Sequence, residues 1–450
     1  MAVAPASALQ QLLAAERERF LAEHPRSAQL AAQAREHLLM GVPMPWMVRW
    51  AGGVPLFLDQ AQGSRVVDAD GREYVDVALG DTGAMTGHSP APVTAAIAAR
   101  RGITTMMPTE DAIAVAGELA RRFGVPAWQF TLSATDANRF ALRMCRQIQR
   151  RPKVLMFQWC YHGSVDESVA ALDDQGVVRP KPGNVGPPVD VALTTRLAEF
   201  NDLDAVRREL AHEDVACVLA EPALTNVGMV LPEDGFLGGL EEACRETGTL
   251  LIYDETHTIS AGPGGCVAAW GLAPDLVTLG KALGAGVPTG AYGVSAAVRD
   301  RILADDEGDY FDWGGVGGTL AGNALSLAAA RATLEHVLTP QAFAHMETAC
   351  TRYREGVEAA FARHGLPWSI VQLGARAEFH FTPEPPRTGG AAHAAIDPLL
   401  DDVLHVALLN RGVLLTPFHN MALFGPSTTT DDVDAVLAAL DEALGLVAAG

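Results

Sequence analysis

The chain has 450 residues, of which 49% are hydrophobic and 19% are charged, and its formal net charge is −21 at pH 7. This composition can bury a large core and excludes an intrinsically disordered chain. Because an acidic surface repels phosphate backbones, the charge also argues against a nucleic-acid partner.

The sequence predicts neither a membrane span nor a secretion signal. Apolar runs such as 215–220 end at a charge, here Glu221, before they reach the length of a membrane span. The N-terminal segment has no basic start and carries Glu16 and Glu18, unlike a signal peptide. The six cysteines have no paired spacing, so we expect free thiols, no metal site and a cytoplasmic location.

In chain order, residues 6–39 have apolar positions at helical spacing and predict helix. A loop with two Pro and two Trp, 41–53, comes next. Residues 55–79 then predict a small antiparallel meander with a turn at Asp70-Gly71. From about 80 to 330 helical and strand patterns alternate, with helices expected at 110–124 and 134–150.

Short apolar runs between these helices predict strands, at 128–133, 153–158, 215–222, 250–255, 276–280 and 291–295. Continuous apolar strands separated by helices indicate a parallel sheet that is buried on both faces. After about 335, a long helix, two strands and a final helix indicate an α+β segment. We therefore expect an α/β large domain of residues 80–333 and a smaller α+β domain built from residues 1–79 and 334–450.

Ligand chemistry in such a sheet gathers where the strands end. The residues directly after the predicted strands are Ser133-Ala134-Thr135, Tyr161-His162-Gly163, Glu221-Pro222, Asp254-Glu255 and Gly280-Lys281. Each has an ordinary structural interpretation by itself, such as a helix cap, a core aromatic or a surface lysine. Lysine, however, accounts for only three of the 33 Lys and Arg residues, at 153, 181 and 281. A retained lysine is a candidate for amine chemistry that Arg cannot supply.

Together these residues describe a pocket for pyridoxal phosphate. Lys281 has apolar and glycine-rich flanks, which favour a neutral, nucleophilic amine able to form a Schiff base with an aldehyde. A buried Asp254 needs a cationic partner, which a pyridinium nitrogen would supply. Ser133 and Thr135, with the amides that open the next helix, suit a phosphate, and Tyr161 can stack on a flat ring.

The motifs LLIYDETHT and LVTLGKALGAG resemble the signature of class III pyridoxal-phosphate aminotransferases, which have fold type I. This family includes ω-amine transaminases and glutamate-semialdehyde aminomutase. SATDAN (133–138) is similar to the family's phosphate loop, YHG (161–163) matches outright, and AEP (220–222) and GGTLAGN (317–323) match further family segments. The resemblance covers nearly the whole chain.

The resemblance implies roles for individual residues. Lys281 would form the Schiff base and move the proton, Asp254 would hold the ring nitrogen, and Tyr161 would lie over the ring. The implied cofactor-binding set is Ser133, Ala134, Thr135, Tyr161, His162, Glu221, Asp254, Thr256, His257, Lys281 and the partner subunit's Thr319. A homodimer with a shared active site follows from that last assignment.

Two positions depart from the family pattern beside the predicted ring. Thr256 stands where Val or Ile is usual. It is either a replacement of similar shape or a residue that changes the electronic environment of the ring. His257 stands where Gln or Met is common, and either approaches the ring hydroxyl or is a satisfied core histidine. Ala134 and Asp136 replace Gly and Glu in the phosphate loop, where we still expect binding.

Substrate specificity in this family depends on Arg residues that grip carboxylates. Thr416 occupies one such Arg position, with His419 nearby, and Trp46 occupies the other, with Arg49 close by. The loop with Met44, Trp46, Met47 and Trp50 is either a hydrophobic plug at the dimer interface or an apolar pocket wall. The candidate pocket residues are Trp46, Arg49, Met85, Thr416 and His419, and the candidate carboxylate partners are Arg49, Arg376 and Arg411.

The sequence therefore predicts a transaminase that moves an amino group from a primary amine or hydrophobic amino compound to a small oxo acid such as pyruvate. A glutamate-1-semialdehyde-type aminomutase and a β-amino acid aminotransferase share the cofactor motifs and stay open as alternatives. A decarboxylase or racemase with the same cofactor is a further alternative. A non-enzyme scaffold is disfavoured because it has no need of Lys281.

Overall fold

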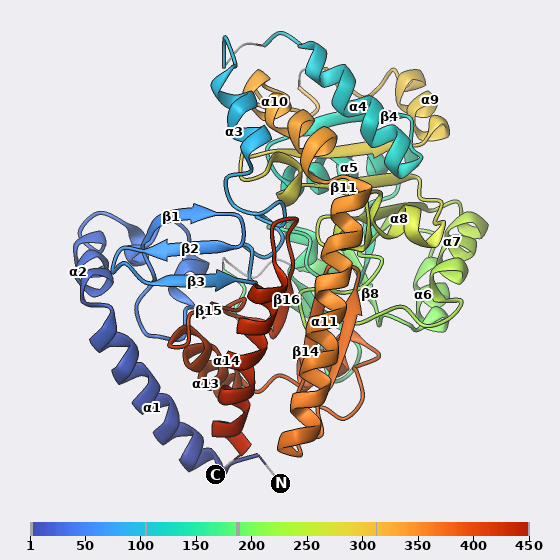
Figure 1. Ribbon diagram of the computed structural model, residues 1–450. Helices are drawn as coiled ribbons and strands as arrows, with labels where there is room; N and C mark the ends of the chain where they lie inside the picture. Colours follow the sequence, from blue (N-terminus) through green and yellow to red (C-terminus); the bar gives the residue numbers. More distant parts are fainter. Residues whose placement is uncertain (1–2, 104–105, 186–189, 312, 449–450) are drawn as a thin grey trace. The chain divides into compact units, whose positions relative to one another are not determined.

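The computed structural model describes residues 3–103, 106–185, 190–311 and 313–448 (Figure 1). The chain forms two compact units. The terminal unit contains Met1–Pro90, Gln341–Pro385 and Ala395–Gly450, and the central unit contains Ala91–Pro340 and Pro386–Ala394. The sequence-based boundaries at 79/80 and 333/334 assign residues 386–394 to the smaller domain, but the structure places them in the central unit.

The central unit is built on a seven-stranded sheet in the order β4-β12-β11-β10-β9-β5-β8. Its strands are β4 (Ala127–Thr131), β5 (Lys153–Phe157), β8 (Thr195–Ala198), β9 (Val215–Ala220), β10 (Leu250–Asp254), β11 (Leu276–Leu279) and β12 (Gly290–Val294). β12 runs antiparallel to β11 and β4, and the other pairings are parallel. The segment joining β11 to β12 holds only a short 3-10 turn, too little for the crossover that a parallel pairing needs. The predicted mostly parallel α/β sheet is confirmed.

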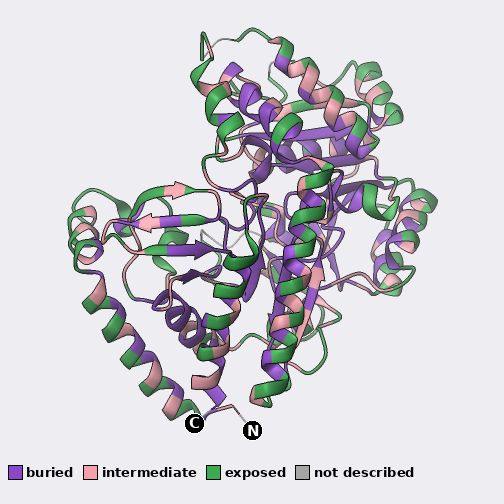
Figure 2. Ribbon diagram, viewed as in Figure 1, coloured by how far each residue is buried: buried purple, intermediate pink, exposed green. Residues whose placement is uncertain are grey.

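Helices cover this sheet, and every residue of β9, β10, β11 and β12 is buried (Figure 2). The helices are α3 (Ala91–Ala98), α4 (Glu110–Phe123), α5 (Ala134–Gln149), α6 (Leu203–Leu210), α7 (Phe236–Thr247), α8 (Gly265–Trp270), α9 (Ala296–Ala304), α10 (Ala324–Ala332) and α12 (Gly389–Ala394). A small hairpin, β6 (Ala170–Leu172) and β7 (Val178–Pro180), follows β5. The sheet therefore forms the core of this unit and leaves only strand ends for chemistry.

The described residues of the terminal unit form two small sheets and five longer helices. The strands are β1 (Leu58–Gln62), β2 (Arg65–Asp68), β3 (Glu73–Asp76) and β15 (Val413–Leu414) in one sheet, and β13 (Ser369–Leu373), β14 (Arg376–His380) and β16 (Met421–Leu423) in the other. The helices are α1 (Ala6–Glu23), α2 (Pro25–Ala34), α11 (Pro340–His364), α13 (Pro398–Leu409) and α14 (Thr430–Ala448). The predicted meander is present, and Gly71 at its turn has φ +81°.

The prediction of helix over 6–39 is wrong in its middle and at its end. α1 stops at Glu23 and α2 begins at Pro25, because the residue before a proline is disfavoured in the helical region. His24 lies at this break with φ −126° and is fully buried. Its ring stacks on Phe20 at 3.9 Å, and its Nε2 lies 2.7 Å from the Tyr74 hydroxyl. At this break the His24 side chain is therefore buried against the meander.

Within the described ranges, the structure contains no helix long and apolar enough to cross a membrane. The same residues contain no group of His, Cys, Asp and Glu that could hold a metal ion. All six cysteines are free and buried.

Arg376 anchors a strained turn in the terminal unit. Its side chain, on β14, is fully buried; Nη2 donates to Thr82 Oγ1 at 2.6 Å and lies 3.4 Å from Asp81 Oδ1. Asp81 and Thr82 have φ of +48° and +78°, which non-glycine residues rarely adopt. The arginine is therefore committed to the fold and is a poor candidate for gripping a substrate carboxylate.

We expect Arg376→Ala to lower the free energy of unfolding by about 3–5 kcal/mol, because it leaves a buried carboxylate without its cation. Arg352→Ala is the matched control, since Arg352 pairs with Asp434 on the surface and its loss should cost about 1 kcal/mol or less. Urea unfolding of both variants measures the difference. Equal midpoints would contradict the structural role of Arg376.

Candidate functional site

The predicted site residues of the central unit gather at one edge of its sheet. β4, β5, β9, β10 and β11 run in the same direction, so their carboxyl ends share that edge. Asp254 is the last residue of β10, and Glu221 directly follows β9. Lys281 and Ser133 lie two residues beyond β11 and β4, and Tyr161 lies shortly after β5.

Asp254 is held by three donors at the end of β10. Its Oδ2 accepts from Asn138 Nδ2 at 2.8 Å and lies 2.9 Å from His162 Nδ1, while Oδ1 accepts from the Thr256 amide at 3.0 Å. Burial favours the neutral acid, but the bonds from His162, Thr256 and Asn138 lower the pKa of Asp254 below its ordinary value. The site therefore keeps a buried carboxylate ionised.

His162 lies against Asp254 and is 1% exposed. Burial disfavours its charged ring, yet the neighbouring Cys160 sulfur and the Asp254 carboxylate together raise the pKa of His162 to about 10. The imidazolium then pairs with the carboxylate. That His162 contacts the cofactor stays a prediction, and the structure adds its contact with Asp254.

The N-terminus of α5 forms a candidate anion site. Ser133 caps the helix, its Oγ accepting from the Asp136 amide at 3.2 Å, and Ala134 and Thr135 form the first turn. First-turn amides have no partner inside a helix and attract anions. The chain packs tightly here: a Cβ on Gly163 would lie 2.0 Å from Thr135 Oγ1, and one on Gly280 would lie 2.8 Å from the Ala134 nitrogen.

Lys281 opens a short 3-10 turn, Lys281–Gly284, directly beyond β11. Its φ of +45° fixes an unusual backbone conformation at this residue. Its Nζ lies 2.7 Å from His257 Nε2, and His257 is 4% exposed. Of the two interpretations of His257 left open by the sequence, neither included this contact with the lysine amine.

Thr256, Glu221 and Tyr161 complete the predicted set on this edge. Thr256 is 5% exposed, and its Oγ1 has no hydrogen-bond partner among the described residues. Glu221 is buried, which raises its pKa; one carboxylate oxygen accepts from the Thr225 hydroxyl and the other from the Tyr161 amide at 3.5 Å. Tyr161 is half-buried beside this acid.

Asn138 and Thr278 are site residues that sequence reasoning missed. Asn138 bridges Asp254 and Thr278, since its Oδ1 accepts from Thr278 Oγ1 at 2.6 Å and its Nδ2 donates to the carboxylate. Both residues are fully buried. The available signal was polarity: Asn138 ends the SATDAN motif, and Thr278 is the one polar residue in the run LVTL.

The predicted substrate-pocket residues belong to the terminal unit. Trp46 meets the Phe418 ring edge-on at 5.8 Å between centroids, and the Arg49 guanidinium lies 5.3 Å from the centre of the same ring. Sequence reasoning missed Phe418, which connects the two predicted residues. Trp46 and Arg49 therefore form one cluster around the Phe418 ring, held by aromatic and cation–π contacts.

Three further pocket candidates are buried in the terminal unit. Met85 is 0% and Thr416 1% exposed, and His419 Nδ1 lies 3.4 Å from Glu378 Oε1. Arg411, a predicted carboxylate partner, is already paired with Glu16 and Glu442. Of the three candidate arginines, Arg49 alone has no ion pair within the described residues.

Thr319 lies on an exposed segment of the central unit. Phe311 and Trp313 on that segment are 91% and 88% exposed. This chain by itself therefore leaves large apolar side chains uncovered beside Thr319.

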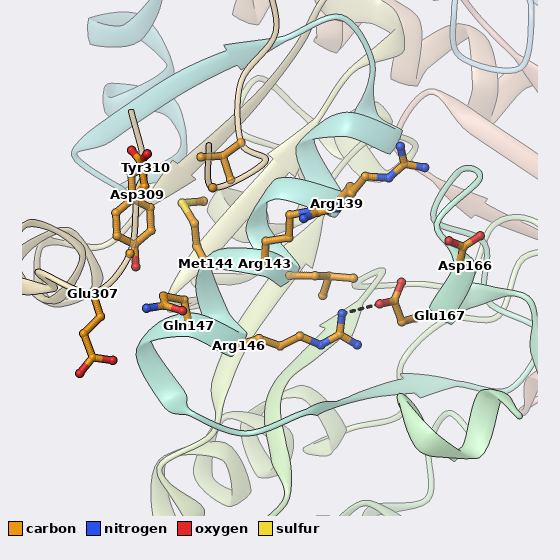
Figure 3. A pocket seen from close by; sticks show the side chains of 14 residues that line it. Arg139, Arg143, Met144, Arg146, Gln147, Asp166, Glu167, Glu307, Asp309 and Tyr310 are labelled. Carbon is orange, nitrogen blue, oxygen red and sulfur yellow. Dashed lines mark hydrogen bonds and ion pairs between the residues drawn. The ribbon is translucent and has the colours of Figure 1, made fainter. Parts of the chain in front are cut away.

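A pocket of about 610 Å³ lies along α5 (Figure 3). Arg139, Arg143 and Arg146 line it from the helix, and Asp166 and Glu167 line it from the opposite side. Arg146 is paired with Glu167. None of the predicted cofactor residues lines this pocket, so we do not assign it as the cofactor site.

We expect Gly163→Ala to weaken pyridoxal-phosphate affinity by about tenfold or more, since the added Cβ displaces Thr135 at a left-handed position, where strain is roughly 1–3 kcal/mol. Gly117→Ala is the control, because Gly117 faces open space inside α4 and should be neutral or slightly stabilising. Equilibrium titration of cofactor-free protein measures both affinities. An unchanged affinity in Gly163→Ala would argue against this loop as the phosphate site.

The pairing of His162 with Asp254 predicts a pH dependence of stability. The folded pKa of about 10 exceeds the unfolded value of 6.5, so this contribution is complete below pH 6.5 and is lost as pH rises through about 10. We expect the stability advantage of the wild type over His162→Asn to shrink across that window. Urea midpoints at a series of pH values test this, with His212→Asn, an exposed site, as control. An advantage that grows with pH would contradict the pairing.

Comparison with known proteins identifies the family. The family model for class-III aminotransferases matches residues 47–444. A glutamate-1-semialdehyde 2,1-aminomutase of Desulforudis audaxviator is 33% identical over 436 residues, spanning 95% of this chain and 99% of that protein.

Solved structures give the same assignment. A structure described as a glutamate-1-semialdehyde-aminomutase from Pseudomonas aeruginosa PAO1 is 50% identical, covers 98% of this chain and 99% of its own, and superposes with a TM-score of 0.95. An omega-transaminase from Sphaerobacter thermophilus is 28% identical, with 94% and 98% coverage and a TM-score of 0.85. The predicted fold type and enzyme class are thereby confirmed. The chain belongs to the class III aminotransferases, enzymes that use pyridoxal 5'-phosphate.

Proposed function

We propose that this protein is a pyridoxal-phosphate-dependent aminomutase, which moves an amino group within one small substrate that carries both an amino and an oxo function. The proposal rests on the arrangement of Lys281, Asp254 and the N-terminus of α5 at one edge of the sheet. The chain that carries this arrangement is 50% identical to the Pseudomonas aminomutase over nearly all its length. The Desulforudis aminomutase supports the same substrate class, glutamate-1-semialdehyde. The alternative left open by the sequence thus has better support than pyruvate-dependent transamination of amines.

The residues on the sheet edge fit the cofactor. The ionised, buried Asp254 suits a cationic ring nitrogen, and the open first turn of α5 suits a phosphate. Thr256 adds a buried hydroxyl to this edge. Lys281, at the end of β11, supplies the amine for an aldehyde.

When bound, pyridoxal phosphate supplies an aldehyde and a ring that withdraws electrons. Asp254 holds the ring nitrogen in its protonated form, and His162 and Asn138 keep the carboxylate oriented. Ser133, Ala134 and Thr135 anchor the phosphate, and Tyr161 packs on the ring. Lys281 would act as the base, accepting a proton from the carbon that loses the amino group and delivering a proton to the carbon that gains it.

A second candidate is intermolecular transamination of an amine or hydrophobic amino compound, including a β-amino acid. Its support is the apolar loop with Trp46 where an Arg was expected, the Thr416 in place of a second Arg, and the Sphaerobacter omega-transaminase. Arg49 is the remaining cation for a substrate carboxylate in this region.

We further infer a homodimer that shares its active sites. Thr319 is exposed on a segment whose Phe311 and Trp313 lie open to solvent, as expected if a second subunit covers them. In that arrangement the partner subunit's Thr319 reaches the phosphate.

We expect the full-length protein, loaded with pyridoxal phosphate, to isomerise glutamate-1-semialdehyde without any added amine or oxo acid. The product has the same mass as the substrate, so NMR of the reaction mixture follows the exchange of the two groups. Lys281→Ala should abolish turnover while the protein still folds.

Two results would redirect this proposal. Turnover that appears only when pyruvate and a separate amine donor are both present would favour the transaminase. In that case a faster half-reaction with glutamate than with any apolar amine would exclude the hydrophobic-amine version.

A further inference from the structure

The contact between Lys281 and His257 adds a function that the family pattern does not supply. Asp254 and Thr278 are register partners on the adjacent parallel strands β10 and β11. The chain beyond each strand end therefore comes together, with His257 three residues past Asp254 and Lys281 three past Thr278. Their nitrogens, Nε2 and Nζ, are 2.7 Å apart.

Both residues are held in place. Lys281 has a left-handed backbone, and Gly280 before it packs against the Ala134 backbone. His257 is 4% exposed, and its carbonyl accepts from the Ser260 amide in the next turn of the chain. Because both backbones are fixed in this way, the fold itself brings the two side chains into contact.

At this separation the two nitrogens are within hydrogen-bond distance, so one of them donates and the other accepts. An ammonium has no lone pair, so Lys281 must lose a proton before it can react. A neutral imidazole at 2.7 Å can take that proton directly. Gln or Met, the residues common at this position in the family, cannot.

We propose that His257 is the proton acceptor for Lys281, so that each reaction of the amine proceeds without proton exchange with bulk water. The N–H bond at Nζ breaks, its electron pair stays on Nζ, and the proton binds to Nε2; the reverse transfer restores the ammonium. No other reactant is required. The inference rests on the proposed role of Lys281 as the reacting amine.

Other charged groups near the pair have partners of their own. Asp254 is bound to His162 and Asn138, and Glu221 to Thr225. Glu255 accepts from Thr258 and from two backbone amides, and burial raises its pKa to about 7. Substitution of His257 leaves these contacts in place.

Amine acetylation of the cofactor-free, full-length chain tests the proposal, because three lysines give three separate peptides in mass spectrometry. Lys153 faces Asp214 at 3.4 Å and Lys181 donates to the Cys160 carbonyl, so both serve as internal standards. We expect His257→Gln to slow acetylation of Lys281 about a hundredfold near neutral pH, the lower end of what a positioned base contributes. In strongly alkaline buffer, where lysines are neutral anyway, the difference should disappear.

His257→Met is the second variant, and unchanged rates at Lys153 and Lys181 show that each variant is folded. An unchanged or faster Lys281 rate near neutral pH, or a deficit that persists in alkali, overturns the role of His257. Borohydride reduction of the pyridoxal-phosphate-loaded wild type tests the proposed function separately. A cofactor label on the Lys281 peptide supports that function even if the His257 result is negative, and no label there rejects it.

Discussion

The buried carboxylate of Asp254 is the constraint on which the rest of this site depends. An ionised acid at 3% exposure is stable only with donors around it, and the fold supplies them from three directions: α5, the segment after β5 and the backbone beyond β10. Those donors fix the relative positions of the segments that carry Ser133, Tyr161 and His257. The same negative charge favours a cationic group at this edge.

Parallel strands explain why these groups meet although they are far apart in the sequence. The carboxyl ends of the parallel strands share one edge, so residues as far apart in the sequence as 133 and 281 come together there. β12 breaks the parallel order, and its Gly290 allows close approach to the Ser133 carbonyl, where a Cβ would be 2.5 Å away. The predicted phosphate site and Lys281 are thereby supported by the same pair of central strands, β11 and β12.

The sequence was sufficient to predict the strands and the residues at their ends, because an apolar run and the residues directly after it are local features. The chemistry assigned to Lys281 and Asp254 stays a prediction. The sequence was insufficient where side chains from distant segments decide the outcome. His162 turned toward Asp254, Asn138 bridged two strands, and Arg376 was drawn into a buried pair with Asp81. The helix break before Pro25 follows from a local rule, that the residue before a proline avoids the helical region, but the prediction of helix over 6–39 did not apply it. Substrate choice stays a prediction, because the candidate residues Trp46, Arg49 and Thr416 lie outside the cofactor motifs.

The most direct test of the central claim is the visible absorption spectrum of the purified, full-length protein with pyridoxal phosphate. It is recorded before and after addition of an amino substrate without any oxo acid. Our account predicts a band from the cofactor joined to Lys281, which decreases as the amino group is taken up and is missing in Lys281→Ala. A protein that gives no such band with excess cofactor, although folded, would contradict the account.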